Sequence, residues 1–255
     1  MRKHALIMGM PILVEIAGAI EDDAVFDRVF TLFRNVDEQF SPFKPQSEVA
    51  RLNLRELDWD ALSPEMREVL ALASETTRQT DGYFSVMHDG VFNPSGLVKG
   101  WAIHRAASLL SNEGWRDFYV DAGGDVAVAG RNGEGEAWRI GIRNPFEPDR
   151  IVKVLTLTTG GVATSALYER GRHIYNPHQA DDLLNQVASL TVVGENIFEA
   201  DRFATAAFAM GRAGIDFIET RTACEGYQIN SDGRAVMTSG LGAYVSKGEA
   251  SPQPA

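Results

Sequence analysis

The sequence of 255 residues contains a single cysteine, Cys224. One thiol can form neither an internal disulfide nor a thiolate metal cluster, so we expect its side chain to act as a small buried hydrophobe. A chain without disulfides fits a reducing compartment.

Long apolar runs are also missing. No stretch approaches the roughly 20 consecutive apolar residues of a membrane-spanning helix. The opening MRKHALIMGMPILVEIAG places basic residues before an apolar stretch, but His4, Gly9, Pro11 and Glu15 interrupt that stretch. No small-residue cleavage pattern precedes the structured part. We therefore expect no signal peptide, no membrane insertion and a cytoplasmic protein.

Positive charge is scarce, since 24 Lys and Arg residues face 35 Asp and Glu residues and give a formal net charge of −11. Phosphate-rich partners would be repelled at long range, which argues against a general binder of nucleic acid or anionic membranes. An anionic ligand would need cations placed locally at its site. The hydrophobic fraction of 44% is that of an ordinary globular protein with a substantial core.

Apolar periodicity predicts both helices and strands along the chain. Helices are expected over 21–40, from the N-cap Ser63 to about Thr80, from about Lys99 to Asn112, over EADRFATAAFAMG (199–211) and over 215–220. Strands are expected at ILVEIAG (12–18, as the first strand), 118–130, 138–143, 152–159 and 189–194, with a hairpin around Ser231-Asp232-Gly233. Because the order is not a regular βαβ alternation, we predict an α+β fold. One domain should cover 1–245, followed by a disordered tail over 246–255.

Four segments combine glycine with polar residues in apolar surroundings: 40–53, 80–102, 121–130 and 163–180. Each is a weak signal alone. Gly123-Gly124 is equally consistent with a simple turn between strands, and Ser95-Gly96 with the start of a helix. Backbone N–H groups in such places also bind phosphate oxygens well.

In this combination and order the segments resemble the ApbE family, the FAD:protein FMN transferases. The matching residues are Met8-Gly9, Ser47-Glu48, Leu52-Asn53, Thr80-Asp81-Gly82, Gly96, Lys99-Gly100, Gly123-Gly124-Asp125, Thr164-Ser165, His173-Ile174, Pro177, Ala200-Asp201 and Ala204-Thr205. They span about residues 8 to 211. The resemblance implies an ApbE-like fold of mixed, largely antiparallel sheets with packed helices in two joined lobes, with FAD as substrate and an acceptor protein as partner.

Asp201 and Thr205 lie four residues apart in an apolar helix, so their side chains share one face. The resemblance implies that both bind Mg²⁺ together with the backbone carbonyl of Val98. Oxygen ligands suit Mg²⁺, which offsets the charge of a diphosphate. The alternative is that Asp201 caps the helix and Thr205 bonds back to it.

The implied reaction is attack by a threonine or serine hydroxyl of the acceptor on the FMN-side phosphorus of FAD, with release of AMP. His173 is the implied general base or proton shuttle, because an unperturbed histidine has a pKa near neutrality. The alternative is that it is a histidine of the core or of a turn. Phe43 would stack on the flavin, or else belong to the core. Lys99 would bind phosphate or cap a helix. The other implied FAD contacts are Met8, Asp81, Gly82, Gly123, Gly124, Asp125, Thr164 and Ser165, with Asp201 and Thr205 acting in catalysis through the metal.

The chain departs from the family pattern at five positions: Ser85, Asn93, Ala166, Asn176 and Ala180. Ser85, Asn93 and Asn176 replace a frequent Asp, and asparagine cannot accept a proton as a carboxylate does. Two other functions therefore remain open. One is hydrolysis of FAD to FMN and AMP at the same site, and the other is FAD binding without turnover.

Overall fold

The computed structural model describes residues 1–19, 23–166, 178 and 186–246. The predicted base His173, the departures Asn176 and Ala180, and residues 247–255 of the predicted tail lie outside this range. Within it, no helix is both long and apolar enough to cross a bilayer.

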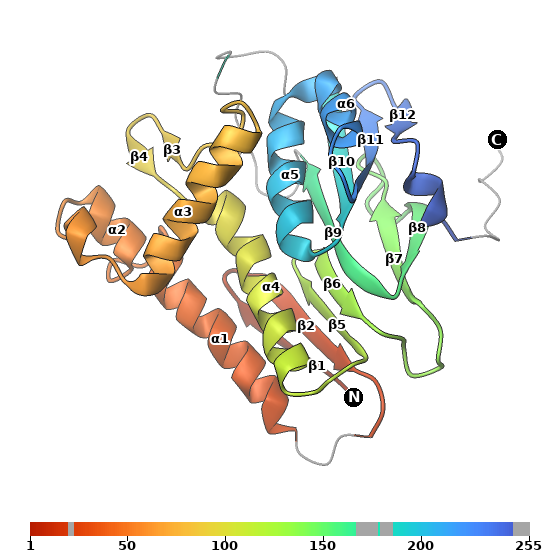
Figure 1. The fold of residues 1–255 in the computed structure, drawn as a ribbon, viewed down its shortest axis with the longest axis horizontal. Helices are drawn as coiled ribbons and strands as arrows, with labels where there is room; N and C mark the ends of the chain where they lie inside the picture. The colour runs from red at the N-terminus through yellow and green to blue at the C-terminus, as the bar shows by residue number, and fades with distance from the viewer. Residues whose placement is uncertain (20–22, 167–177, 179–185, 247–255) are drawn as a thin grey trace.

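An antiparallel sheet of eight strands forms the centre of the fold (Figure 1). Its strands, in spatial order, are β1 (Arg2–Ile7), β2 (Met10–Ile16), β5 (Phe118–Ala122), β6 (Asp125–Ala129), β9 (Thr159–Ala166), β10 (Val187–Gly194), β11 (Cys224–Asn230) and β12 (Ala235–Met237). Two hairpins stand outside it, β3 (Met87–His88) with β4 (Val91–Phe92) and β7 (Trp138–Arg143) with β8 (Ile151–Leu157). The predicted hairpin around Ser231-Asp232-Gly233 is confirmed as β11 and β12.

The predicted first strand is in fact the second. The preceding residues RKHALI form β1, which pairs with β2 from Ile7 opposite Met10 to Arg2 opposite Glu15. As the edge strand of the sheet it is mostly exposed or half-buried and carries charged residues. An edge strand of this kind lacks the apolar signal on which sequence reasoning depends.

The helices are α1 (Ala24–Phe40), α2 (Glu48–Asn53), α3 (Pro64–Gln79), α4 (Ser95–Asn112), α5 (Ile197–Ala209) and α6 (Gly214–Glu219). Helix α3 begins as predicted, with the Ser63 hydroxyl accepting the Met66 N–H at 3.1 Å. Helix α4 begins four residues before the predicted start at Lys99. The Asn93 side chain accepts the Ser95 N–H at 3.1 Å and so ties down the first turn. The sequence pattern does not predict this turn, because it contains glycine, which has a poor helix propensity.

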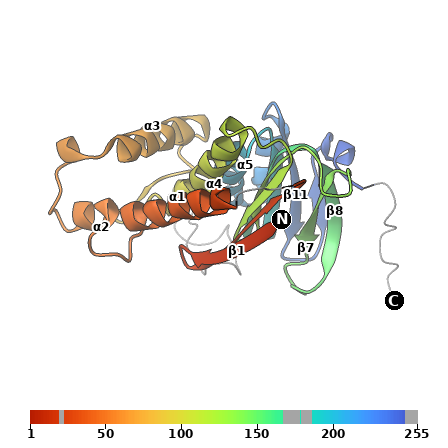
Figure 2. The same cartoon turned by 90° about the horizontal axis from the view of Figure 1, so that it is seen from below.

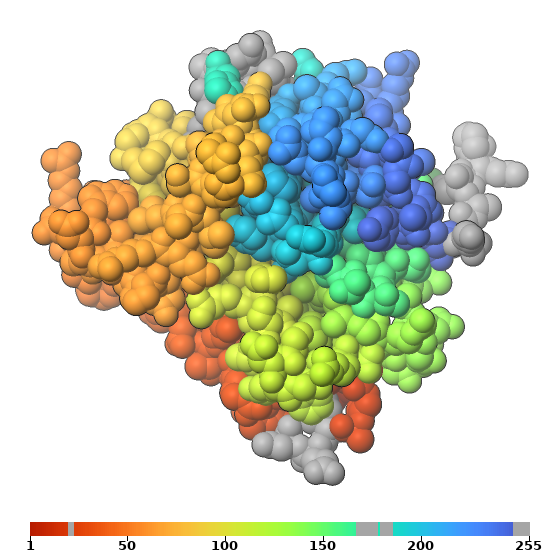
Figure 3. All heavy atoms as spheres, viewed as in Figure 1, coloured from red at the N-terminus to blue at the C-terminus, as the bar shows by residue number. Residues whose placement is uncertain are grey.

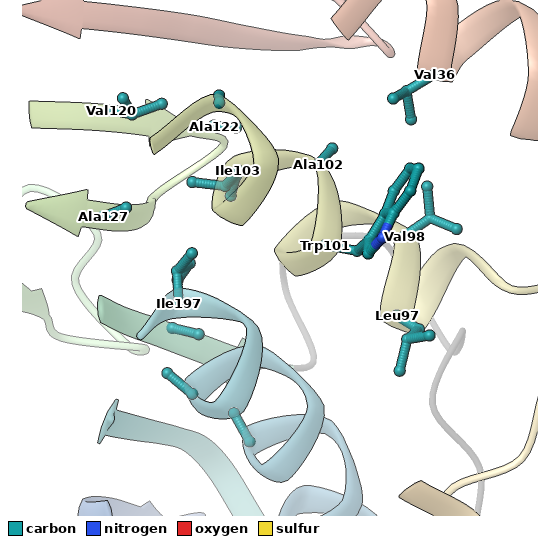
Figure 4. Close-up of a cluster of buried hydrophobic side chains, with 14 of the residues drawn as sticks. Val36, Leu97, Val98, Trp101, Ala102, Ile103, Val120, Ala122, Ala127 and Ile197 are labelled. Carbon is teal, nitrogen blue, oxygen red and sulfur yellow. The ribbon is translucent and has the colours of Figure 1, made fainter. Parts of the chain in front are cut away.

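Each face of the sheet has its own hydrophobic cluster. Helices α1, α4 and α5 cover one face, where Ile103 of α4 lies over Val120 and Ala127 (Figure 4). The other face packs Val126 and Val162 against the β7 and β8 hairpin. Figure 2 shows this hairpin beyond β11 and away from α1 and α4. The arrangement confirms the predicted α+β class, with one large and one smaller core.

Helix α5 lies against β9 at Gly161. A methyl group on Gly161 would come within 2.3 Å of the Ile197 Cα, which is backbone and cannot turn away. We expect Gly161→Ala to lower the free energy of unfolding by about 3 kcal/mol, as overpacking does. The matched control is Gly133→Ala, where nothing lies within 4 Å of the added group. Urea unfolding of both variants tests this, and equal midpoints would contradict the close contact.

Candidate functional site

Two tight turns mark the end of the sheet that carries the predicted site. Met8 and Gly9 have φ of 56° and 70°, and Gly123 and Gly124 have φ of 64° and 95°. Positive φ at both central residues of a two-residue hairpin loop is the type I′ geometry. The turns are neighbours, because the Gly123 N–H donates to the Pro11 carbonyl at 3.1 Å. The glycine turn leads directly into Asp125, the first residue of β6.

Asp201 lies inside α5 and does not cap it. The N-cap is Asn196, whose side chain accepts the Glu199 N–H at 3.0 Å. The Asp201 carboxylate instead faces α4: one oxygen, Oδ2, accepts the Gly100 N–H at 2.7 Å, and Oδ1 lies 3.5 Å from the Lys99 Nζ. With only 4% of the residue exposed, this carboxylate is buried between two helices. The capping alternative is therefore wrong.

Asp125 reaches the same place from the sheet. It is 1% exposed and forms an ion pair through Oδ2 with the Lys99 ammonium. Its Oδ1 accepts the Thr164 N–H of β9 at 3.0 Å. Lys99 thus joins a carboxylate of β6 to one of α5. Because it lies well inside α4, which ends at Asn112, the alternative that it caps a helix is wrong.

The charges of this cluster are unbalanced. Burial raises the pKa of the Asp201 carboxyl, and the nearby Asp125 raises it further, while the Lys99 ammonium and the Gly100 N–H oppose the rise. When both carboxyls are ionised, two carboxylates and one ammonium leave an excess negative charge in a place with little water. A buried charge is costly unless it is paired, so the cluster favours a further cation.

Thr205 follows Asp201 by one turn of α5 and lies against the first turn of α4, which carries Val98. A methyl group on Gly96 would lie 3.6 Å from the Thr205 Cγ2, which brings this threonine against the first turn of α4. Val98 lies in that turn, with its side chain in the core beside Trp101 (Figure 4).

The donor set at this point consists of oxygen atoms. Among the described residues, no three His, Cys, Asp or Glu side chains converge on one point, so a cation would also need hydroxyl, carbonyl or substrate oxygens. The carboxylate of Asp201, the hydroxyl of Thr205 and the carbonyl of Val98 are of these kinds. Mg²⁺ binds to one or two carboxylates and completes its shell with water and substrate phosphates. The residues present fit this ion chemically.

The predicted diphosphate contacts have protein partners in this structure. The N–H of Gly124 donates to the Asp121 Oδ1 at 2.8 Å, and those of Gly123 and Thr164 donate to Pro11 and Asp125. The Thr164 hydroxyl lies 2.8 Å from that of Thr191. Thr164 alternates with Ala163 of the helix-side core, so its side chain faces away from Lys99. A ligand at these donors would have to share or replace existing bonds, and the predicted contacts stay predictions.

Ser165 points to the opposite face from Thr164. It pairs with Leu190, which belongs to the helix-side core, and directly opposed residues share a face. Ser165 therefore lies on the same side of the sheet as Asp125, and only 6% of it is exposed.

The predicted flavin-binding turn follows α3. Asp81 and Gly82 both have positive φ, 49° and 81°. His178, which the sequence analysis did not select, places its Nε2 2.8 Å from the Asp81 carbonyl oxygen and its ring edge-on to Tyr83 at 4.6 Å. His178 occupies a position that the family pattern leaves open, next to Pro177, so no motif could have identified it.

Phe43 lies in the loop between α1 and α2 and is 90% exposed. The alternative that it belongs to the core is therefore wrong. An aromatic ring left in water is available for a ligand, which agrees with a stacking role without testing it.

Other residues of the matched segments maintain the fold around that loop. The Ser47 hydroxyl accepts the Ala50 N–H at 3.0 Å and caps α2. The Asn53 side chain bonds both the N–H and the carbonyl of Phe92, each at 2.8 Å. These contacts join α2 to the β3 and β4 hairpin, which leads into α4.

The ApbE family model matches residues 8–93 and 88–227. Since these ranges cover most of the sequence, the chain belongs to the ApbE family. Among solved structures, the ApbE protein of Thermotoga maritima is similar with a TM-score of 0.83 and 19% identity, covering 97% of this chain and 99% of that one. The flavin transferase ApbE of Vibrio cholerae gives a TM-score of 0.81 at 20% identity, over 96% and 99%. At these identities the likeness shows the fold.

Curated relatives carry the name FAD:protein FMN transferase. The protein of Vibrio cholerae is 31% identical over 126 residues, which is 46% of this chain and 38% of the relative. That of Escherichia coli strain K12 is 27% identical over 153 residues, 56% of this chain and 44% of the relative. The matched region is thus less than half the length of either relative.

Proposed function

We propose that this protein is an Mg²⁺-dependent FAD:protein FMN transferase. The observation that carries the proposal is the buried Asp201 carboxylate, held by the Gly100 N–H beside Thr205 and Lys99. Together they form an oxygen-lined site with one fixed cation, which suits a diphosphate with its metal. Membership of the ApbE family and the names of the curated relatives support the same activity.

In the proposed reaction a threonine or serine hydroxyl of the acceptor protein attacks the FMN-side phosphorus of FAD. A new O–P bond joins FMN to the acceptor, the phosphoanhydride bond breaks, and AMP leaves with the bridging oxygen. The hydroxyl proton goes to a base, for which we propose His173, outside the described residues. Asp201, Thr205 and the Val98 carbonyl would hold Mg²⁺, which supplies positive charge to the diphosphate when bound.

We assign different residues to the diphosphate and to the flavin of FAD. The Lys99 side chain is 13% exposed and its ammonium lies 3.5 Å from the Asp201 Oδ1, so we assign it to the diphosphate. The exposed ring of Phe43 and the turn at Asp81 and Gly82 are assigned to the flavin. Met8, Gly123, Gly124, Thr164 and Ser165 complete the proposed FAD site near one end of the sheet. Asp125 contributes to the site by holding Lys99.

FAD should be preferred over nucleotides that lack a flavin. Both FAD and ATP present phosphates to the cation, but only FAD has a ring system for Phe43 and the turn after α3. Stacking and burial of such a ring are worth on the order of 1.4 kcal/mol or more, so we expect at least about tenfold tighter binding of FAD. Calorimetry with Mg²⁺ measures this, and equal affinities for FAD and ATP would contradict the proposed substrate.

A further inference from the structure

The Lys99 ammonium has two carboxylate neighbours that differ in how they are held. Asp125 has both oxygens occupied, one by Lys99 and the other by the Thr164 N–H, and is 1% exposed. It cannot approach a ligand without losing these bonds. It acts on the site by holding Lys99 and by its own charge close to Asp201, which makes it a positioning residue.

Asp201 holds Lys99 more loosely. Its Oδ1 lies 3.5 Å from the ammonium, beyond hydrogen-bond length, while its Oδ2 is fixed by Gly100. The oxygen that faces Lys99 is therefore the one that can change partner. Residues around it, namely Thr205 and the first turn of α4, provide the further oxygens of the proposed metal site.

We propose that Lys99 is a resident counterion that competes with the metal for Asp201. Without metal, its ammonium partly neutralises Asp201. Metal loading takes over the Oδ1 of Asp201, while the ion pair with Asp125 keeps Lys99 at the edge of the site. The inference rests on the proposed function in one respect, that Asp201 is a metal ligand.

The charges of the site predict how the competition changes the affinity for the metal. With both carboxyls ionised, the two carboxylates and Lys99 sum to −1, and a divalent ion raises the total to +1. Removing the lysine charge changes these totals to −2 and 0, so the metal enters a more negative site. Because unit charges within about 4 Å interact by several RT near a protein surface, we expect removal of the charge to tighten metal binding about tenfold or more.

The test is the affinity for Mn²⁺, a spectroscopic substitute for Mg²⁺ at oxygen ligands, measured without FAD by electron paramagnetic resonance. We compare the wild-type protein with Lys99→Met and with Lys99→Arg, which keeps the charge. The expected result is a dissociation constant about tenfold lower in Lys99→Met and unchanged within about threefold in Lys99→Arg. Lys99→Gln, a polar neutral side chain, serves in the same way if Lys99→Met does not fold.

The outcomes separate the inference from the proposed function. If wild-type protein binds Mn²⁺ and the neutral variant binds it equally or more weakly, the competition is overturned and the metal site stands. Absence of Mn²⁺ binding from wild type and Asp201→Asn alike, with or without FAD, would instead overturn the metal site and with it the inference. Tighter binding in the neutral variants that disappears on adding Asp201→Asn would support both.

Discussion

Asp201→Ala is expected to lower metal-dependent turnover of FAD by about 100-fold or more. The variant removes the one carboxylate of the proposed metal site, and loss of a charged ligand leaves the diphosphate charge poorly screened as the anhydride breaks. The fold should persist, because Lys99 keeps its ion pair with Asp125. Among the described residues, the Gly100 N–H loses the Asp201 carboxylate as an acceptor, at a cost of roughly 1–3 kcal/mol, and Lys99 loses its weaker contact with Asp201. Initial rates across a range of Mg²⁺ concentrations measure the effect.

Asp201→Asn is the matched control, because it keeps the shape and can still accept the Gly100 N–H but carries no charge. Its stability should stay closer to wild type than that of Asp201→Ala, while its turnover should fall almost as far. Wild-type rates with unchanged Mg²⁺ dependence in either variant would remove Asp201 from the metal site.

Gly100→Ala should have the second largest effect, although no side chain of the site is altered. A Cβ at this position would lie 2.6 Å from the Asp201 Cβ and 2.7 Å from its Oδ2. The clash is with an atom next to the α5 backbone, so α4 and α5, which lie side by side in Figure 3, would have to separate. Metal affinity should fall about tenfold or more, and the free energy of unfolding by ~1–3 kcal/mol. Metal titration and urea unfolding report the two effects.

Gly96→Ala in the same helix distinguishes this clash from a general effect of substitution. Its added methyl group would meet Phe84 and Thr205 at 3.6 Å, an ordinary contact distance. Alanine normally stabilises a helix relative to glycine by about 1 kcal/mol, so this variant should be as stable as wild type or more so. Similar losses of stability in both variants would show that the close approach of Gly100 to Asp201 is not what matters.

The sequence was a good guide wherever the pattern was local. Ser63 with Pro64 marks the start of α3 because an N-cap hydroxyl and a first-turn proline have few other uses. Ser231-Asp232-Gly233 marks a hairpin for similar reasons. Edge strand β1 and the first turn of α4 were missed, because one lacks apolar contrast and the other is rich in glycine, which disfavours helix.

The family resemblance indicated the site residues, but their arrangement could be seen only in the fold. Lys99, Asp125 and Asp201 lie far apart in the sequence, and only the packing of α4 and α5 on the sheet brings them together. No periodic pattern in the sequence predicts that contact. The sequence also did not predict which face of β9 Thr164 occupies. Successive residues of a strand point to opposite faces of the sheet, and the Thr164 hydroxyl contacts Thr191 on the face opposite to the site.

Intact-mass spectrometry of an acceptor peptide is the most direct test of FMN transfer to a protein hydroxyl. The peptide should contain a family-type D-x-x-[ST]-G-A-[ST] segment and be incubated with FAD, Mg²⁺ and this protein. The account predicts a mass increase of one FMN less one water, with AMP released in equal amount and no increase when Mg²⁺ is chelated. An unmodified peptide would contradict it, indicating hydrolysis if free FMN and AMP accumulate and simple binding if FAD stays intact.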